Sequence, residues 1–141
     1  MEKKLSPNSY EKIRSTLIEF NQFWSKNVPL LIITIAHTKY TYKEKDNYHA
    51  FYDLGQSVGN LSLQATYMGL YLHQMGGFDA DKAKEIFALP ENYVAVSAIA
   101  VGYIGSLDEL SEELRKIEEE PRSRKELSDI VFTEKFGIPF K

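Results

Sequence analysis

The sequence predicts an α+β fold, a β-sheet flanked by helices with one long central helix. Residues 28–38 form a continuous apolar and β-branched run, which is typical of an interior strand. Residues 92–104 alternate and are rich in β-formers, which predicts a second buried strand. Between them, residues 50–75 place apolar side chains at helical spacing. We expect the two strands to be sheet neighbours with the helix packed against them.

The helical segments have recognisable ends. After a capping Ser6 or Asn8 beside Pro7, apolar residues recur every three or four positions up to Trp24, which predicts one helix. Small residues interrupt the long helix at Gly55, Gly59, Ser62 and Gly69. Each interior glycine costs up to about 1 kcal/mol relative to alanine, so their number indicates close packing on both sides of this helix.

The second half of the chain begins with a short helix, for which Asp79 is the expected N-cap and Pro90 the stop. We interpret residues 1–141 as a single, partial domain in which 106–141 form an extended C-terminal arm. The arm is charged, but its end carries an apolar cluster that favours packing on another subunit: Ile130, Val131, Phe132, Phe136, Ile138 and Phe140.

Composition excludes several classes of protein. With 141 residues and 43% hydrophobic positions, the chain can bury one core and reads as soluble. A net charge of −3 gives no general attraction to nucleic acid or to an anionic membrane. The lack of cysteine excludes disulfides, thiolate zinc sites and thiol nucleophiles, and favours a cytoplasmic location. We expect neither a secretory signal nor a membrane-spanning segment.

Few side chains suggest catalysis or metal binding. His37, His49 and His73 are scattered without the spacing or carboxylate neighbours of a metal site, so we assign no metal. Nucleophile-elbow, phosphate-loop and dinucleotide-fingerprint motifs are all missing from the sequence.

The segment "LHQMGGFD", residues 72–79, allows two interpretations. Gly76-Gly77 is either a helix stop with positive φ, or a turn whose bare backbone approaches a ligand. The local sequence does not choose between them.

Four segments in register carry a resemblance: "FNQFWSKNVPLLIITIA", "YDLGQSVGNLSLQATYMGLYLHQMGGFD", "LPENYVAVSAIAVGYIG" and "PRSRKELSDIVF". In this order and spacing, they resemble the C-terminal two-thirds of the FMN-dependent nitroreductase family. The family's first strand, N-terminal helices and Arg-rich phosphate-binding segment have no counterpart here. Arg14-Ser15 is no substitute for that segment, because it lies inside the first predicted helix.

The resemblance implies FMN as cofactor and assigns residues to it. It places Met75, Gly76 and Gly77 along the flavin edge, with a backbone N–H directed at flavin N5. We then expect Gly77→Val to weaken FMN binding much more than it perturbs the fold. A β-branched residue suits positive φ badly, and its side chain would occupy the space of the flavin ring.

The resemblance also assigns Arg122 and Arg124 to the FMN phosphate, since arginines one residue apart in an extended segment project to the same side. A solvated charge run, neutralised by residues 118–120, is the alternative. Tyr40, Tyr42 and Tyr48 correspond to the family's mobile aromatic lid, or else belong to an ordinary polar loop.

The implied activity is a two-step oxidoreduction in which NAD(P)H passes hydride through the flavin to a nitroaromatic, quinone or similar small acceptor. No side chain is named as catalytic acid or base. The resemblance and the glycine-lined helix 50–75 both indicate a homodimer. A truncated, non-catalytic remnant of the family, acting as a dimeric structural or flavin-binding module, is the alternative function.

Overall fold

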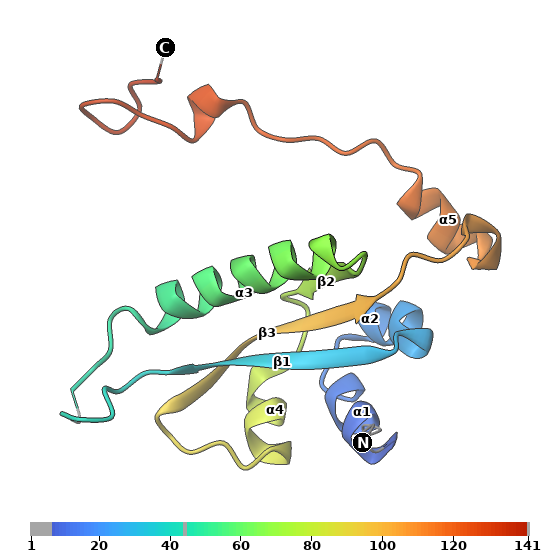
Figure 1. Cartoon of the computed structure of the whole chain (residues 1–141), viewed down its shortest axis with the longest axis horizontal. Coiled ribbons are helices and arrows are strands. Elements are labelled where there is room, and N and C mark those ends of the chain that lie inside the picture. Colours follow the sequence, from blue (N-terminus) through green and yellow to red (C-terminus); the bar gives the residue numbers. More distant parts are fainter. Residues whose placement is uncertain (1–6, 44, 141) are drawn as a thin grey trace. The chain divides into compact units, whose positions relative to one another are not determined.

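The computed structural model describes residues 7–43 and 45–140 (Figure 1). It contains two compact units, Met1–Gly105 and Ser106–Lys141. The first unit holds the β-sheet and most of the helices, and each unit is described by itself below.

The sheet of the first unit has three antiparallel strands in the order β1-β3-β2. These are β1 (Leu30–His37), β2 (Tyr71–Met75) and β3 (Tyr93–Gly102). The two strands predicted from sequence pair along their whole length, so the expected adjacency of 28–38 and 92–104 is confirmed. One register shift follows Thr34, whose hydroxyl lies 2.8 Å from the Ser97 hydroxyl across the ladder.

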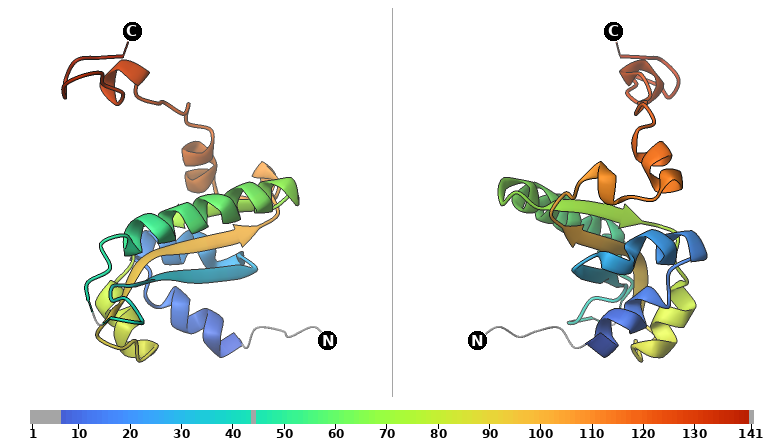
Figure 2. Two further views of the ribbon diagram at one scale, coloured as in Figure 1. Left: turned by 60° about the vertical axis from the view of Figure 1, so that its left-hand side comes forward. Right: turned by 90° about the vertical axis from the view of Figure 1, so that its right-hand side faces the viewer.

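Helices cover both faces of this sheet (Figure 2). The long helix α3 (Ala50–Tyr67) packs on one face, where Val58 meets Ile99 and Val101 of β3. The other face carries α1 (Pro7–Arg14), α2 (Glu19–Trp24) and α4 (Ala80–Ile86). Its core contains Leu17, Leu31, Met75, Ala98 and Ala100. Helices and sheet therefore form the predicted α+β arrangement.

The predicted helix over 50–75 is wrong at its C-terminal end. The helix stops at Tyr67 because Gly69 adopts φ +76°, a left-handed conformation that glycine accepts readily. The Gly69 N–H then donates to the Thr66 carbonyl at 3.0 Å, and the chain turns back. Residues 71–75 continue as β2, because an extended chain here can pair with the free edge of β3.

The prediction of one continuous first helix is also wrong. The helix divides into α1 and α2, because the backbone between them binds the segment after β2. The Asp79 N–H donates to the Thr16 carbonyl at 2.7 Å, and Leu17 forms an isolated bridge with Phe78. The first helix begins at Pro7, and the proposed cap Ser6 lies outside the described residues. A 3₁₀ turn, η1 (Ser25–Asn27), connects α2 to the strand region.

The predicted short helix is confirmed as α4. The Asp79 carboxylate accepts from the Lys82 N–H at 2.9 Å, which is the expected N-cap. The helix ends at Ile86, ahead of the predicted stop at Pro90, and Ala88 then takes a positive φ of 48°.

The second unit has little regular structure. It contains η2 (Leu107–Glu109), α5 (Glu112–Glu118) capped by Ser111, and η3 (Leu127–Asp129). Near its end, Phe132 and Pro139 form an isolated bridge, and the rings of Phe132 and Phe136 lie 4.8 Å apart. Most apolar side chains of this unit are exposed, including Phe136 at 93%.

Candidate functional site

The turn at Gly76-Gly77 follows β2, not a helix. Among the described glycines only Gly69 and Gly137 have positive φ, so the turn needs no left-handed residue. The helix-stop interpretation of Gly76-Gly77 is therefore wrong, and the helix stop is Gly69. The turn lies where β2 leaves the sheet and the chain crosses to α4.

Hydrogen bonds fix both carbonyl groups of this turn. The Phe78 N–H donates to the Gly76 carbonyl at 3.0 Å. The Gly77 carbonyl accepts two hydrogen bonds, from the Ile18 N–H at 3.1 Å and from the Asn21 side-chain amide at 2.9 Å. The start of α2 thus holds the turn from one side.

The N–H groups of the turn are available to a ligand. Within the described part of the chain, neither the Gly76 nor the Gly77 N–H donates a hydrogen bond. Gly76 is exposed, and an added Cβ there would meet no atom within 4 Å. Two backbone donors at an open turn can bind an acceptor atom on the edge of a flat ligand.

The two glycines differ in what surrounds them. A Cβ at Gly77 would lie 2.7 Å from Ile18 Cδ1 and 2.8 Å from Asn21 Nδ2. Glycine is required here by the approach of α2, and not by positive φ. Valine at Gly77 would thus clash with Ile18 and Asn21, so we expect it to perturb the fold as well, and its larger effect on FMN binding stays a prediction.

Met75, the third predicted residue of the turn, is 3% exposed and belongs to the core beside Leu17 and Ala98. Its side chain anchors the end of β2 in the core. Any contact of Met75 with a cofactor would have to come from its backbone.

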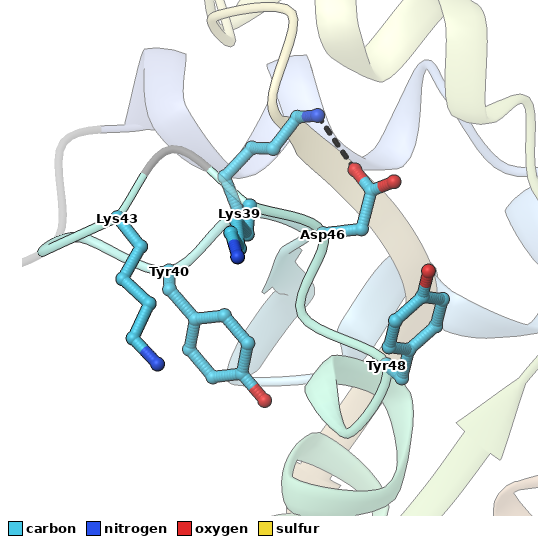
Figure 3. Close-up of a pocket in the computed structure, with 6 residues that line it drawn as sticks. Lys39, Tyr40, Lys43, Asp46 and Tyr48 are labelled. Atoms are coloured by element: carbon cyan, nitrogen blue, oxygen red, sulfur yellow. Dashed lines mark hydrogen bonds and ion pairs between the residues drawn. The ribbon is translucent and has the colours of Figure 1, made fainter.

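The predicted lid residues lie in the connection between β1 and α3. This loop is closed by a Lys39–Asp46 ion pair at 2.6 Å and by a hydrogen bond from the Tyr40 N–H to the Lys45 carbonyl (Figure 3). An open cavity of about 370 Å³ is lined by Lys39, Tyr40, Lys43, Lys45, Asp46 and Tyr48. Tyr42 does not line it, but its ring lies 5.5 Å from that of Tyr40, under the Lys43 ammonium.

The lid loop and the glycine turn leave the sheet at different points along β3. Both β1 and β2 run antiparallel to β3, but β1 ends with His37 opposite Tyr93, whereas β2 ends with Met75 opposite Ala98, midway along β3. The loop follows β1 and the turn follows β2. Tyr48, 87% exposed, has its side chain free to contact a bound molecule.

Arg122 and Arg124 belong to the second unit and are exposed, in a stretch without regular secondary structure. Arg124 Nη1 donates to the neighbouring Ser123 carbonyl at 2.7 Å. In the described residues, neither arginine forms an ion pair with residues 118–120. The exposure of both arginines is consistent with a solvated charge run, and their contact with the FMN phosphate stays a prediction.

Sequence reasoning missed Asn21 and Trp24. The Trp24 indole N–H donates to the Asn21 side-chain oxygen at 3.0 Å, and Asn21 is 8% exposed. An amide and an indole three residues apart on a helix were the available signal.

Two absences are found in the described part of the chain. No three His, Cys, Asp or Glu side chains gather there as a metal site. None of its helices is long and apolar enough to cross a lipid bilayer.

Comparison with known proteins decides the family. The model of the nitroreductase family matches residues 4–103, which is most of the chain. The chain belongs to the nitroreductase family. The fold is that of this family, since nitroreductase-family crystal structures superimpose on it.

Among solved nitroreductase-type structures, an oxidoreductase containing FMN is 26% identical, with a TM-score of 0.82 over 93% of this chain and 67% of that one. A nitroreductase family protein from Clostridium difficile 630 is 23% identical, with a TM-score of 0.62 over 90% of this chain and 68% of that one.

A sequence relative is an uncharacterized 15.4 kDa protein from Mycolicibacterium smegmatis, 28% identical over 96 residues. The aligned region is 68% of this chain and 65% of that protein. The chain therefore spans slightly less than two thirds of that relative's length.

Proposed function

We propose that this nitroreductase-family protein is an FMN-dependent oxidoreductase that passes hydride from NAD(P)H to a small acceptor such as a nitroaromatic or a quinone. The observation that carries the proposal is the pair of N–H groups at Gly76 and Gly77, neither of which donates a hydrogen bond to any described residue. Membership of the family and the similarity to an FMN-containing oxidoreductase support it.

The open space at Gly76 supports the approach of an isoalloxazine ring edge. Such an edge needs N–H donors with no side chain in the way, and a Cβ at Gly76 would meet no atom within 4 Å. When bound, FMN supplies the acceptance and release of hydride. A backbone N–H donor supplied by the turn would stabilise electron density on the reduced ring, so the turn would tune the bound cofactor.

Other residues take supporting roles in this proposal. Arg122 and Arg124 contact the FMN phosphate, for which paired guanidinium groups are suited. Tyr40, Tyr42 and Tyr48 cover the flavin and the acceptor. No side chain is assigned as acid or base, because the chain's task is to bind, orient and exclude water.

We propose a cytoplasmic homodimer as the functional unit. Large apolar side chains are exposed along α3 and at Met68, which follows it: Phe51, Tyr52, Leu61, Leu63, Tyr67 and Met68. On the same helix, Gly55 and Gly59 have no atom within 4 Å of a built Cβ, so a second helix can approach closely. The exposed apolar end of residues 128–140 offers a second surface to the partner chain.

The test is a titration of purified protein with FMN, followed by visible absorbance and thermal unfolding. We expect saturable binding and a higher Tm with excess FMN, because a ligand that binds only the native state stabilises it. Riboflavin, which lacks the phosphate, is the matched control and should bind more weakly. Oxidation of NADH or NADPH with a quinone acceptor then tests turnover.

A protein that stays colourless and gains no stability with excess FMN would contradict the flavin proposal. A dimer under those conditions would identify the chain as a non-catalytic module of the family. Bound FMN without turnover would leave the flavin site intact and reject only the oxidoreductase activity.

A further inference from the structure

The Asn21 side chain is a buried amide whose two ends have different partners. Its nitrogen donates to the Gly77 carbonyl at 2.9 Å, and its oxygen accepts from the Trp24 indole at 3.0 Å. The indole is a donor only, so it determines which end of the amide faces Gly77. The Trp24 ring is itself held edge-on against His73 of β2, with ring centroids 5.0 Å apart.

These contacts determine where the turn's N–H groups point. The C=O and N–H of one peptide unit point in opposite directions. The Gly76 carbonyl is held by Phe78, so the Gly77 N–H of the same peptide must point away from that bond. The Gly77 carbonyl is held by Asn21 and Ile18, so the turn has little freedom to rotate.

We propose that Asn21 is a positioning residue that fixes the ligand-facing N–H of Gly77, with Trp24 fixing the Asn21 amide in turn. The inference rests on the proposed flavin function for its ligand, but its structural part concerns this chain alone. Asn21 does not touch the cofactor. It acts through the peptide groups of the turn and thereby sets both the affinity for FMN and the preference for its reduced form.

The size and chemistry of Asn21 both matter to this role. Aspartate keeps the size and the acceptor for Trp24, but places a carboxylate oxygen against the Gly77 carbonyl, and two acceptors cannot share a hydrogen bond. Phenylalanine at Trp24 keeps a six-membered ring but removes the indole donor together with the five-membered ring that carries it. Asn21→Asp therefore changes the chain of hydrogen bonds with little loss of volume, and Trp24→Phe changes it with the loss of part of the ring system.

Gln22 provides a matched control. It is the neighbouring amide of α2, and its Nε2 donates to the Leu17 carbonyl at 2.7 Å, not to the turn. Gln22→Ala therefore removes a comparable hydrogen bond from the same helix, one from a side-chain amide to a backbone carbonyl. It should lower stability without changing the turn.

The first measurement is made on the protein without flavin. In ¹⁵N NMR, the Gly76 and Gly77 amides should show increased picosecond to nanosecond motion in Asn21→Asp, and less of an increase in Trp24→Phe. Gln22→Ala should leave both amides as in wild type. Unchanged Gly76 and Gly77 dynamics in Asn21→Asp would overturn the positioning role.

The second measurement is FMN affinity and the midpoint potential of bound FMN. We expect Asn21→Asp to weaken binding of reduced FMN about tenfold more than that of oxidised FMN. For a two-electron couple, that ratio lowers the midpoint potential by about 30 mV. Gln22→Ala should keep the wild-type potential, even where its thermal stability falls.

The outcomes separate the two proposals. If wild type fails to bind FMN, the proposed function is wrong, while the NMR measurement still decides the role of Asn21. If wild type binds FMN and both variants keep its potential and affinity, this inference is wrong and the flavin proposal stands. If Asn21→Asp does not fold, Trp24→Phe carries the same comparison.

Discussion

A single methyl group added at Gly77 tests the packing of the turn against α2. In Gly77→Ala, the new Cβ would lie 2.7 Å from Ile18 Cδ1 and 2.8 Å from Asn21 Nδ2. A Cβ essentially never comes this close to an atom to which it is not bonded, so both neighbours must move. Ile18 is 51% exposed and can rotate toward solvent at low cost. Asn21 is buried and hydrogen-bonded at both ends of its amide, so it cannot move freely.

The magnitude follows from what Asn21 loses. A broken hydrogen bond of this kind costs about 0.5–1.5 kcal/mol, and a buried polar group left without a partner adds to it. Overpacking by one methyl group in a filled site typically costs about 1–3 kcal/mol in total. We therefore expect Gly77→Ala to lower the free energy of unfolding by about 1–3 kcal/mol. In a domain of about 100 residues, each kcal/mol lowers Tm by roughly 4–8 °C.

Gly76→Ala is the matched control, one residue away. Its Cβ would meet nothing within 4 Å, and Gly76 is not among the residues with positive φ. Alanine at a compatible site reduces the entropy of the unfolded chain, so stability should stay constant or rise by about 0.4–1 kcal/mol. Urea unfolding followed by tryptophan fluorescence measures both variants, because the single Trp24 lies beside Asn21.

The variants Gly76→Ala and Gly77→Ala separate an effect on stability from an effect on ligand binding. Gly76→Ala should weaken FMN binding while preserving stability, since its methyl group points into the open space before the turn. Gly77→Ala should impair both. If Gly77→Ala proves as stable as Gly76→Ala, the close approach of α2 to the turn is wrong, and the Asn21 argument fails with it.

Three further predictions concern other parts of the chain. Changing both Arg122 and Arg124 to alanine should make FMN affinity less dependent on salt, because the attraction of arginine for phosphate is electrostatic. FMN titrations from low to high ionic strength measure this, and an unchanged salt dependence would rule out the phosphate contact. Deleting residues 128–141 should lower dimer stability and flavin retention together in sedimentation at micromolar concentration, and a compact wild-type monomer would contradict the dimer. Burial raises the pKa of Tyr10, whose hydroxyl donates to the Ser25 carbonyl. Protonated Tyr10 therefore stabilises the folded state below pH 10.0, and this stabilisation is lost as the pH rises through the higher pKa of Tyr10 in the folded state. Tyr10→Phe should therefore unfold with a weaker dependence on pH above 10, as followed by circular dichroism.

The sequence by itself determined the main elements of the first unit. The β-branched runs of β1 and β3 and the Asp79 cap depend on neighbours close in the chain, and they appear where the pattern placed them. The helix predicted over 50–75 appears as far as Tyr67. The family could also be identified from the sequence, because four segments have the order and spacing that they have in the nitroreductase family. These are properties of local preference and burial, which one sequence records directly.

Where a local sequence pattern fits two conformations, contacts between distant segments decide which one forms. Residues 71–75 continue the apolar spacing of a helix, but Gly69 turns the chain and the edge of β3 supplies its hydrogen-bond partners. Residues 15–18 break a helical pattern because the segment after β2 binds their backbone. Asn21 looks like a surface polar residue until the Gly77 carbonyl, 56 positions away in sequence, comes within 2.9 Å. Hydrogen bonds between distant segments leave no periodicity in the chain, so only the folded structure reveals them.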